Sequence, residues 1–453
     1  MIKKLLVANR GEIAVRIIRA CKEMGIETVA VYSQADQEAL HVQMANEAIC
    51  IGPAASSQSY LNMNNLIQAA CSTGCDAIHP GFGFLSENSR FARLVHDCGL
   101  IWIGPNADVI ERLGNKTEAR QMMASVGIPI IPGTQTVLES CEQARLVAQE
   151  VGYPVILKAS NGGGGKGMRI VYDASEFSEL YAQTQAEAKL CFGSDAVYLE
   201  KYIENPKHIE VQLAGDSFGH AVHLYERDCS FQIRNQKMIE ECPCLTLKED
   251  LRKQLCQSAV DACKTVGYDS VGTVEFLLDG ENYYFMEMNT RIQVEHPITE
   301  MITGIDLIRL QITLAQGYSL PFKQEDIHCV GHAIECRINA EDIHHEFKGC
   351  AGKINFFHAP GGNGIRVDGA IYTGYSIPPY YDSMLCKIIA YAPNRKQAIR
   401  KMRMALEEII VDGIESNEEF LYRALCQDEF ISGEYKTSFA QKFYEELKAE
   451  HLI

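Results

Sequence analysis

A glycine-rich stretch, Lys158–Ile170, limits the folds open to this chain because it places five glycines around one lysine. A Walker phosphate-binding loop needs glycine six residues before that lysine and Ser or Thr directly after it. Ser160 and Gly167 occupy those positions, so the Walker pattern is excluded. The dinucleotide pattern G-x-G-x-x-G matches Gly162, Gly164 and Gly167 in letters only, because that pattern must lead from a strand into a helix.

Strand-like sequences flank the glycines on both sides. Tyr153–Leu157 is apolar and Met168–Tyr172 alternates apolar and polar residues, which is typical of strands. We therefore predict a glycine-rich hairpin. A solvent-exposed turn without a ligand is the alternative, but Lys158 and Lys166 favour a bound anion.

The composition predicts a large globular chain with small-molecule ligands. At 453 residues with 47% hydrophobic composition, the chain is long enough for about three domains. A net charge of -17 argues against nucleic-acid binding, which requires a basic face. No apolar run approaches the roughly 18 residues of a membrane span, and the first residues lack a signal sequence. We expect a cytoplasmic protein without a membrane partner.

The 17 cysteines do not predict a disulfide framework or a zinc site. Their number is odd, they are scattered, and no C-x-x-C pair occurs. We expect reduced and mostly buried thiols.

The N-terminal region has the pattern of a Rossmann-like βαβ unit. Strands are predicted at Lys3–Ala8 and Glu27–Tyr32, with an amphipathic helix at Glu12–Met24 between them. Further on, strands with polar faces are predicted between Lys201 and Phe322. Helices are predicted near the C-terminus, at Asn394–Glu408 and Ser416–Cys426.

The densest group of chemically active residues lies in Phe285–His296. In an extended chain alternate side chains point to the same side, which would place five polar residues in one row: Glu287, Asn289, Arg291, Gln293 and Glu295. A half-exposed strand with salt bridges would show the same alternation. Carboxylate and amide oxygens together favour Mg²⁺, which prefers hard oxygen ligands.

A second carboxylate, Glu275, lies in the apolar strand-like segment Ser270–Asp279, where an unpaired charge is costly to bury. If this segment pairs antiparallel with Tyr283–Asn289, Glu275 lies close to Glu287. Two adjacent carboxylates repel each other, and a divalent metal is the usual remedy. The segment Lys207–Gln212 alternates in the same way and would place three more polar side chains on one face: His208, Glu210 and Gln212.

These motifs, in this order along nearly the whole chain, resemble the ATP-grasp enzymes. The resemblance is carried by Lys158–Ile170, Glu200–Gln212, Glu275 and Glu287–His296. Three further stretches resemble the biotin carboxylase family: Ala8–Ala14, His79–Asn88 and Arg227–Ser230.

The resemblance implies an α/β (α+β) chain of three domains. It implies an N-terminal Rossmann-like biotin carboxylase domain at residues 1–112 and an ATP-grasp domain at residues 113–324. Within the latter, a mobile glycine-rich lid would span about residues 131–203. A C-terminal biotin carboxylase domain would span residues 325–453.

The resemblance also implies roles for particular residues. ATP contacts are implied for Lys116, Lys158, Gly164, Gly165, Glu200, Lys201, Tyr202, Ile203, His208, Glu275 and Glu287. The implied ligands of Mg²⁺ or Mn²⁺ are Glu275, Glu287 and Asn289. The implied bicarbonate and biotin residues are Lys237, Arg291, Gln293, Val294, Glu295 and Arg337. Among these, Glu295 would be the general base and Arg337 would stabilise the biotin enolate.

The implied reaction is ATP-dependent carboxylation of biotin by bicarbonate through carboxyphosphate, as the first half-reaction of acetyl-CoA carboxylase in fatty-acid synthesis. The biotin attachment signal Met-Lys-Met is absent, so a biotin carboxyl carrier protein and carboxyltransferase subunits are implied as partners. The nearest match, Met402–Met404, has arginine in the middle. A homodimer is also implied, with Arg16, Arg19 and Glu23 as a candidate contact or, alternatively, a solvated helix face.

Three positions depart from the family pattern. Ile233 and Asn235 stand where basic residues are usual near the nucleotide pocket, and Phe82 stands where tyrosine is usual near biotin. Three alternative functions therefore stay open: the equivalent component of another acyl-CoA or pyruvate carboxylase, a different ATP-grasp carboxylate-amine ligase, and a nucleotide-binding regulatory paralogue.

Overall fold

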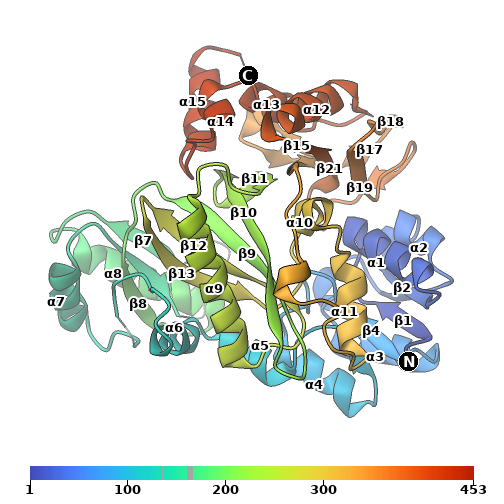
Figure 1. The fold of residues 1–453 in the computed structure, drawn as a ribbon, viewed down its shortest axis with the longest axis horizontal. Coiled ribbons are helices and arrows are strands. Elements are labelled where there is room, and N and C mark those ends of the chain that lie inside the picture. Colours follow the sequence, from blue (N-terminus) through green and yellow to red (C-terminus); the bar gives the residue numbers. More distant parts are fainter. Residues whose placement is uncertain (135, 161–166, 453) are drawn as a thin grey trace.

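The protein is described by a computed structural model that covers residues 1–134, 136–160 and 167–452. The N-terminal region is a sheet of five parallel strands, in the order β3-β2-β1-β4-β5, with helices on its faces (Figure 1). Its strands are β1 (Lys4–Val7), β2 (Glu27–Ser33), β3 (Glu47–Gly52), β4 (Ala77–His79) and β5 (Ile101–Trp102). Its helices are α1 (Gly11–Glu23), α2 (Leu40–Met44), α3 (Met63–Ser72) and α4 (Ser89–Asp97). The predicted βαβ unit is confirmed.

The apolar spacing of α1 explains its place in the fold. Ile13, Ile17 and Cys21 recur every four residues and are buried. They pack with Leu5 of β1 and with Leu307 of α11 (Leu307–Ala315) in one core. The first helix therefore joins the N-terminal sheet to the centre of the molecule.

A small lobe carries the glycine-rich hairpin, on the left of Figure 1. Its antiparallel sheet has the order β7-β6-β8, with β6 at Val155–Ala159, β7 at Met168–Val171 and β8 at Val197–Lys201. Lys158 pairs with Met168, so the predicted hairpin is confirmed. Residues 161–166 between them, including Gly164 and Gly165, lie outside the described residues. The lobe is covered by α7 (Cys141–Val151) and α8 (Phe177–Phe192).

The central sheet has eight antiparallel strands in the order β13-β12-β9-β10-β11-β14-β21-β19. The first five are β9 (Lys207–Gly215), β10 (Ala221–Ile233), β11 (Gln236–Cys242), β12 (Val271–Asp279) and β13 (Asn282–Asn289). The other three are β14 (His332–Asn339), β19 (Ile365–Gly369) and β21 (Met384–Ala392). The sheet is thus continuous across the boundary predicted at residue 324, because β11 pairs with β14.

Two sequence predictions in this region are wrong. The extended row predicted through Glu295 ends with β13 at Asn289, and the chain then turns into α10 (His296–Thr303). Helices interrupt the region predicted as strands between Lys201 and Phe322: α9 (Glu249–Val266), α10 and α11. The 18-residue helix α9 buries Leu255, Ala259 and Val266 against β9 and β10. This helical spacing was overlooked beside the polar strands.

The remaining helices complete the fold. Between the N-terminal sheet and the lobe lie α5 (Ala107–Gly114) and α6 (Lys116–Ser125). The C-terminal helices are α12 (Arg395–Glu408), α13 (Glu418–Ala424), α14 (Asp428–Ser432) and α15 (Phe439–Ala449). Short strands join them: β15 (Glu341–Asp342), β16 (Lys348–Gly349), β17 (Gly352–Lys353), β18 (Phe356–His358), β20 (Ser376–Ile377) and β22 (Ile410–Asp412).

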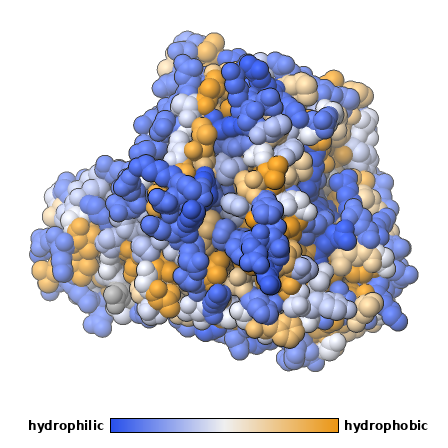
Figure 2. Space-filling view, in the orientation of Figure 1, coloured by the Kyte–Doolittle hydropathy of each residue, from blue (hydrophilic) through white to orange (hydrophobic). Residues whose placement is uncertain are grey.

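The surface agrees with the acidic composition. Hydrophilic residues cover most of the face in Figure 2, with apolar residues in small groups. Within the described residues, no helix is both long and apolar enough to cross a bilayer. All 17 cysteines are free thiols, and nine of them are buried.

Candidate active site

The site is built on one row of charged residues that crosses four strands of the central sheet. Arg227 of β10 lies opposite Glu210 of β9, Glu210 lies opposite Glu275 of β12, and Glu275 lies opposite Glu287 of β13. Directly opposite residues of antiparallel strands point to the same face, with Cβ atoms about 5 Å apart. The predicted proximity of Glu275 and Glu287 is therefore confirmed. Three neighbouring carboxylates require cations close by.

Arg227 supplies the first cation. Its side chain is fully buried, and its Nε donates to Glu210 over 2.5 Å. Its two terminal nitrogens donate to Gln212 (2.6 Å) and Gln293 (2.5 Å), and also to Thr299 and Thr273. The sequence analysis used Arg227 only as part of a motif. The structure shows that it links three strands to the segment before α10.

Lys237 of β11 supplies the second cation. Its Nζ lies 2.6 Å from Glu210, 3.0 Å from Glu275 and 2.7 Å from Glu295. Burial alone would lower the pKa of the Lys237 ammonium, but these three carboxylates hold that pKa well above its ordinary value. A lysine with three acidic neighbours stays charged and can exchange one of them for an anionic substrate.

Glu295 lies at the junction between the irregular segment 290–295 and α10. One oxygen accepts from Lys237 and the other from Arg337 of β14, the latter over 3.0 Å. Burial would raise the pKa of the Glu295 carboxyl, but Lys237, Arg337 and Arg227 hold it well below its ordinary range. Glu295 is therefore ionised at neutral pH and able to accept a proton.

Arg337 is held in turn by a residue that the sequence analysis missed. Its Nε donates over 2.6 Å to Glu240 of β11, which is fully buried. Burial raises the pKa of Glu240 to about 7, although Arg337 opposes the shift. Glu240 carried no sequence signal, because Arg337 lies almost one hundred residues away along the chain.

Arg291 reaches the N-terminal region. Its Nε lies 3.0 Å from Glu87, and its Nη2 donates to Asn289. Glu87 also accepts from the amide of Thr290. Glu87 lies inside the quoted motif His79–Asn88, so a signal for it was present although no role was assigned.

The oxygen-rich end of the row suits a hard divalent cation. Glu275 and Glu287 face each other, and Asn289 donates to Glu275 over 2.8 Å. Lys116 of α6 lies 3.1 Å from Glu287. Carboxylate and amide oxygens are ligands that Mg²⁺ prefers. Donor atoms of a second group also lie within 4.8 Å of one another: His208, Glu210 and Glu275.

The residues expected to contact the nucleotide lie around the small lobe. Lys158 of β6 lies 2.5 Å from Glu200 of β8, which also pairs with Arg120. Lys201 is engaged differently from the expectation of a free side chain, since its Nζ donates to the carbonyls of Gly152 (2.9 Å) and Tyr153 (3.0 Å).

The backbone of the same strand is also partly occupied. The amides of Lys201 and Tyr202 donate to the carbonyls of Pro132 and Pro154. These two amides are therefore not free for an adenine ring. Ile203 is half-buried, and the buried His208 interacts with Gln232 over 2.8 Å.

Two positions noted in the sequence have structural explanations. Ile233 is buried in the C-terminal core with Phe231 and Met238. Asn235 has a positive φ of 64° in the turn between β10 and β11, a conformation that asparagine tolerates well. Ile233 therefore serves packing.

The candidate dimer contact is only partly at the surface. Arg16 is buried and pairs with Glu300 (2.9 Å) and Asp306 (2.7 Å) of the same chain, whereas Arg19 and Glu23 are exposed. Arg16 points inward because its helix packs on α11. The contact predicted for Arg16 is therefore wrong in this form.

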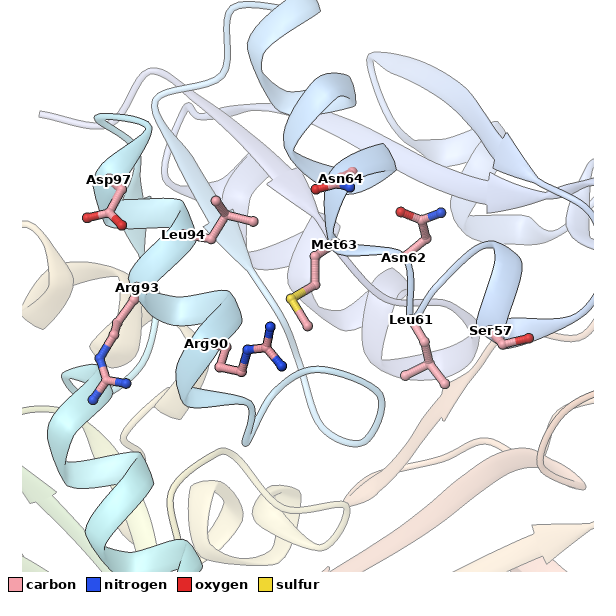
Figure 3. A pocket seen from close by; sticks show the side chains of 9 residues that line it. All are labelled: Ser57, Leu61, Asn62, Met63, Asn64, Arg90, Arg93, Leu94 and Asp97. Carbon is pink, nitrogen blue, oxygen red and sulfur yellow. The ribbon is translucent and has the colours of Figure 1, made fainter. Parts of the chain in front are cut away.

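A hollow of about 600 Å³ opens between α3 and α4 (Figure 3). None of its lining residues belongs to the predicted site. They are Ser57, Leu61, Asn62, Met63, Asn64, Arg90, Arg93, Leu94 and Asp97.

Comparison with known families covers nearly the whole chain. Residues 1–110 match the biotin carboxylase N-terminal domain, and residues 335–442 match the biotin carboxylase C-terminal domain. Residues 115–323 match the ATP-binding domain of the carbamoyl-phosphate synthase L chain.

Two relatives and two solved structures are similar over most of their length. Biotin carboxylase 1 of Bacillus subtilis is 54% identical over 98% of this chain and 99% of its own. The chloroplastic biotin carboxylase of Arabidopsis thaliana is 51% identical over 98% of this chain and 83% of its own. A Campylobacter jejuni biotin carboxylase complex with a β,γ-ATP ligand has a TM-score of 0.95 at 46% identity, covering 98% and 99%.

The second structure is the biotin carboxylase domain dimer of Hydrogenobacter thermophilus 2-oxoglutarate carboxylase, solved with MgADP, ADP and bicarbonate. It has a TM-score of 0.94 at 47% identity and covers 98% of this chain and 99% of that one. The fold and the charged row define an ATP-grasp enzyme. This chain belongs to the biotin carboxylase family. Its activity is the ATP-dependent carboxylation of biotin, with bicarbonate as the carboxyl donor and Mg²⁺ as the metal.

Proposed function

We propose that this chain is the biotin carboxylase component of a multisubunit acetyl-CoA carboxylase and supplies the first half-reaction of fatty-acid synthesis. The observation that carries the proposal is the position of Glu295, ionised between Lys237 and Arg337. A carboxylate held by two cations can take the proton of bicarbonate, while the cations receive the substrate's charge.

The first step uses the residues on either side of Glu295. Lys237, Arg291 and the amide of Val294 bind bicarbonate, with Gln293 beside them. Glu295 removes the bicarbonate proton, and the bicarbonate oxygen attacks the γ-phosphate of ATP. Carboxyphosphate and ADP are the products of this step. Positive groups are needed because phosphoryl transfer concentrates negative charge on the phosphate oxygens.

The nucleotide and metal roles follow from the other end of the row. Lys116 and Lys158 hold the phosphates of ATP, and Glu200, Ile203 and His208 lie on the adenosine side. Glu275, Glu287 and Asn289 hold Mg²⁺ or Mn²⁺, which neutralises charge between the β- and γ-phosphates. Gly164 and Gly165, outside the described residues, would cover the phosphates.

The second step transfers the carboxyl group to biotin. Carboxyphosphate separates into CO₂ and phosphate, and the phosphate takes the ureido proton of biotin. Arg337 lies where its guanidinium can stabilise the resulting enolate, because it already binds Glu295 and Glu240. A closed site is required, since water would hydrolyse carboxyphosphate.

Several features of the assembly belong to the same proposal. Biotin arrives on a separate carrier protein, and a carboxyltransferase on other chains accepts the carboxyl group. The chain forms a homodimer in the cytoplasm, and its domains span residues 1–112, 113–324 and 325–453. The C. jejuni complex and the H. thermophilus domain dimer support the nucleotide site and the dimer.

The test is ATP hydrolysis measured with and without free biotin in the presence of bicarbonate. We expect biotin to stimulate ADP release, and Arg337→Ala to abolish carboxylation while the thermal unfolding temperature changes little. Absence of stimulation would contradict the proposal. ADP release stimulated by an amino acid instead of bicarbonate would indicate a carboxylate-amine ligase.

The acyl acceptor is tested separately, because another chain selects it. Proteins that copurify with this chain should include a biotinylated carrier and a carboxyltransferase that acts on acetyl-CoA. A carboxyltransferase acting on pyruvate or 2-oxoglutarate would overturn the acetyl-CoA assignment and leave the biotin carboxylase activity standing.

A further inference from the structure

Lys387 is a buried lysine that no step above uses. It lies in the middle of β21, and its side chain is fully buried between Cys386 and Ile388, which are buried too. A lysine in an apolar strand is costly unless its ammonium is paired and hydrogen-bonded. Its partners therefore show why a lysine stands here.

The ammonium of Lys387 binds the backbone beside the general base. Its Nζ donates to the carbonyl oxygen of Val294 over 2.5 Å and lies 3.3 Å from Glu12 of α1. On the neighbouring strand β14, Arg337 lies directly opposite Lys387 and binds the carboxylate of Glu295. Two adjacent cations thus hold two consecutive residues, one by its backbone and the other by its side chain.

We propose that Lys387 is a positioning residue of the active site, which sets the orientation of the Val294–Glu295 peptide for bicarbonate binding and proton transfer. This inference rests on the proposed function of Val294 and Glu295. Lys387 does not touch the reacting atoms.

The need for such a residue follows from the backbone around Val294. Strand β13 ends at Asn289 and α10 begins at His296, so residues 290–295 belong to neither a strand nor a helix. Because a peptide is planar, fixing the carbonyl of Val294 also fixes the N–H of Glu295. A hydrogen bond from an ammonium is about twice as strong as one between neutral groups. A misplacement of about 1 Å can cost about 100-fold in rate.

The surroundings keep Lys387 charged. Burial would lower the pKa of its ammonium, but the carboxylates of Glu12, Glu335 and Asp368 raise it, against an opposing effect from Arg366. Glu12 is itself buried, and neither of its oxygens has a hydrogen-bond partner within the described chain. Glu12 lies inside the motif Ala8–Ala14, so this arrangement also gives that motif a physical purpose.

The decisive experiment compares full-length wild type with Lys387→Met. The Michaelis constants for bicarbonate and for ATP are measured separately in biotin-stimulated ATP hydrolysis. We expect kcat/KM for bicarbonate to fall by about 10- to 100-fold, with the KM for ATP within about twofold of wild type. Ile388→Val on the same strand is the matched packing control and should leave both constants unchanged.

Two further variants separate positioning from folding. Glu12→Gln keeps the bond from Lys387 to Val294 and should change kcat/KM for bicarbonate by less than about threefold. If Lys387→Met does not fold, Glu12→Gln/Lys387→Met removes both buried charges together and is measured in its place.

The proposal is overturned if bicarbonate kinetics are unchanged in a folded variant, or if the bicarbonate and ATP constants deteriorate together. Wild type without biotin-stimulated ATP hydrolysis would instead contradict the proposed function. The two failures are therefore distinguishable.

Discussion

The N-terminal sheet and the central sheet bury their strands in opposite ways. In the N-terminal sheet, β1 is a continuous apolar run whose Leu5, Leu6 and Val7 are fully buried, as in parallel sheets covered by helices. In the central sheet, β9 is equally buried, yet it carries His208, Glu210 and Gln212.

The difference teaches that burial alone does not indicate what a strand does. The N-terminal strands contribute apolar area and position loops at their ends. The central strands bury charges in alternation with counter-charges, and each charge depends on a neighbour on another strand. Substitutions should therefore reduce stability in the first sheet and should affect stability, activity or both in the second.

The largest effect is expected at the base. Glu295→Gln removes the proton acceptor while keeping the shape of the side chain, so biotin-stimulated turnover should fall by about 100- to 10,000-fold. Thermal unfolding should remain cooperative. The exposed Glu281→Gln is the control and should retain full turnover. An active, folded Glu295→Gln enzyme would remove Glu295 from the mechanism.

Arg227 tests the charged row as a structural unit. Arg227→Met leaves Glu210 buried with one counter-charge fewer, and the free energy of unfolding should fall by about 3–5 kcal/mol. Urea denaturation measures it. Arg309→Met, whose side chain is half exposed and 3.8 Å from Glu23, should change stability by less than about 1 kcal/mol. Equal effects of the two variants would mean that burial of the row is unimportant.

Leu5 tests the apolar sheet. Leu5→Ala leaves a cavity in the core beneath α1, and should lower the free energy of unfolding by about 3 kcal/mol. The KM values for ATP and bicarbonate should not change at a temperature where the variant is folded. Leu190→Ala, at a side chain that is 87% exposed, should have no effect on stability. A changed KM in Leu5→Ala would blur the distinction between the sheets.

The smallest effect concerns pH. Burial lowers the pKa of His41 to about 4, against the ordinary value of 6.5. The unfolded chain therefore binds a proton that the folded chain refuses, and stability falls as pH drops from about 6.5 towards 4. The loss is at most about 3 kcal/mol.

His41→Gln should reduce the slope of unfolding free energy against pH in that interval. The exposed His345→Gln should keep the slope of wild type. An unchanged slope in His41→Gln would show that His41 is protonated in the folded protein.

Local patterns predicted much of both sheets. The βαβ unit at the N-terminus, the hairpin around Lys158 and the pairing of Glu275 with Glu287 were predicted because each depends on residues close in sequence. The row through Glu295 was wrong after Asn289, because alternation in sequence cannot show where a strand ends.

Long-range partners could not be predicted in this way. Glu240 reaches Arg337, Glu87 reaches Arg291 and Lys387 reaches Val294 from other strands or another region. None of these residues stands out in its own segment.

The sequence by itself determined the chemistry available to this protein: its acidic, three-region chain, its glycine-rich hairpin and the ordered motifs that mark an ATP-grasp carboxylase. Tertiary structure alone decided which charges meet. The register of β9, β10, β12 and β13 places Arg227 and Lys237 among the carboxylates, and β21 brings Lys387 to the backbone of Val294. The reason is physical, since a buried charge is stable only beside its partner, and that partner comes from a distant part of the chain.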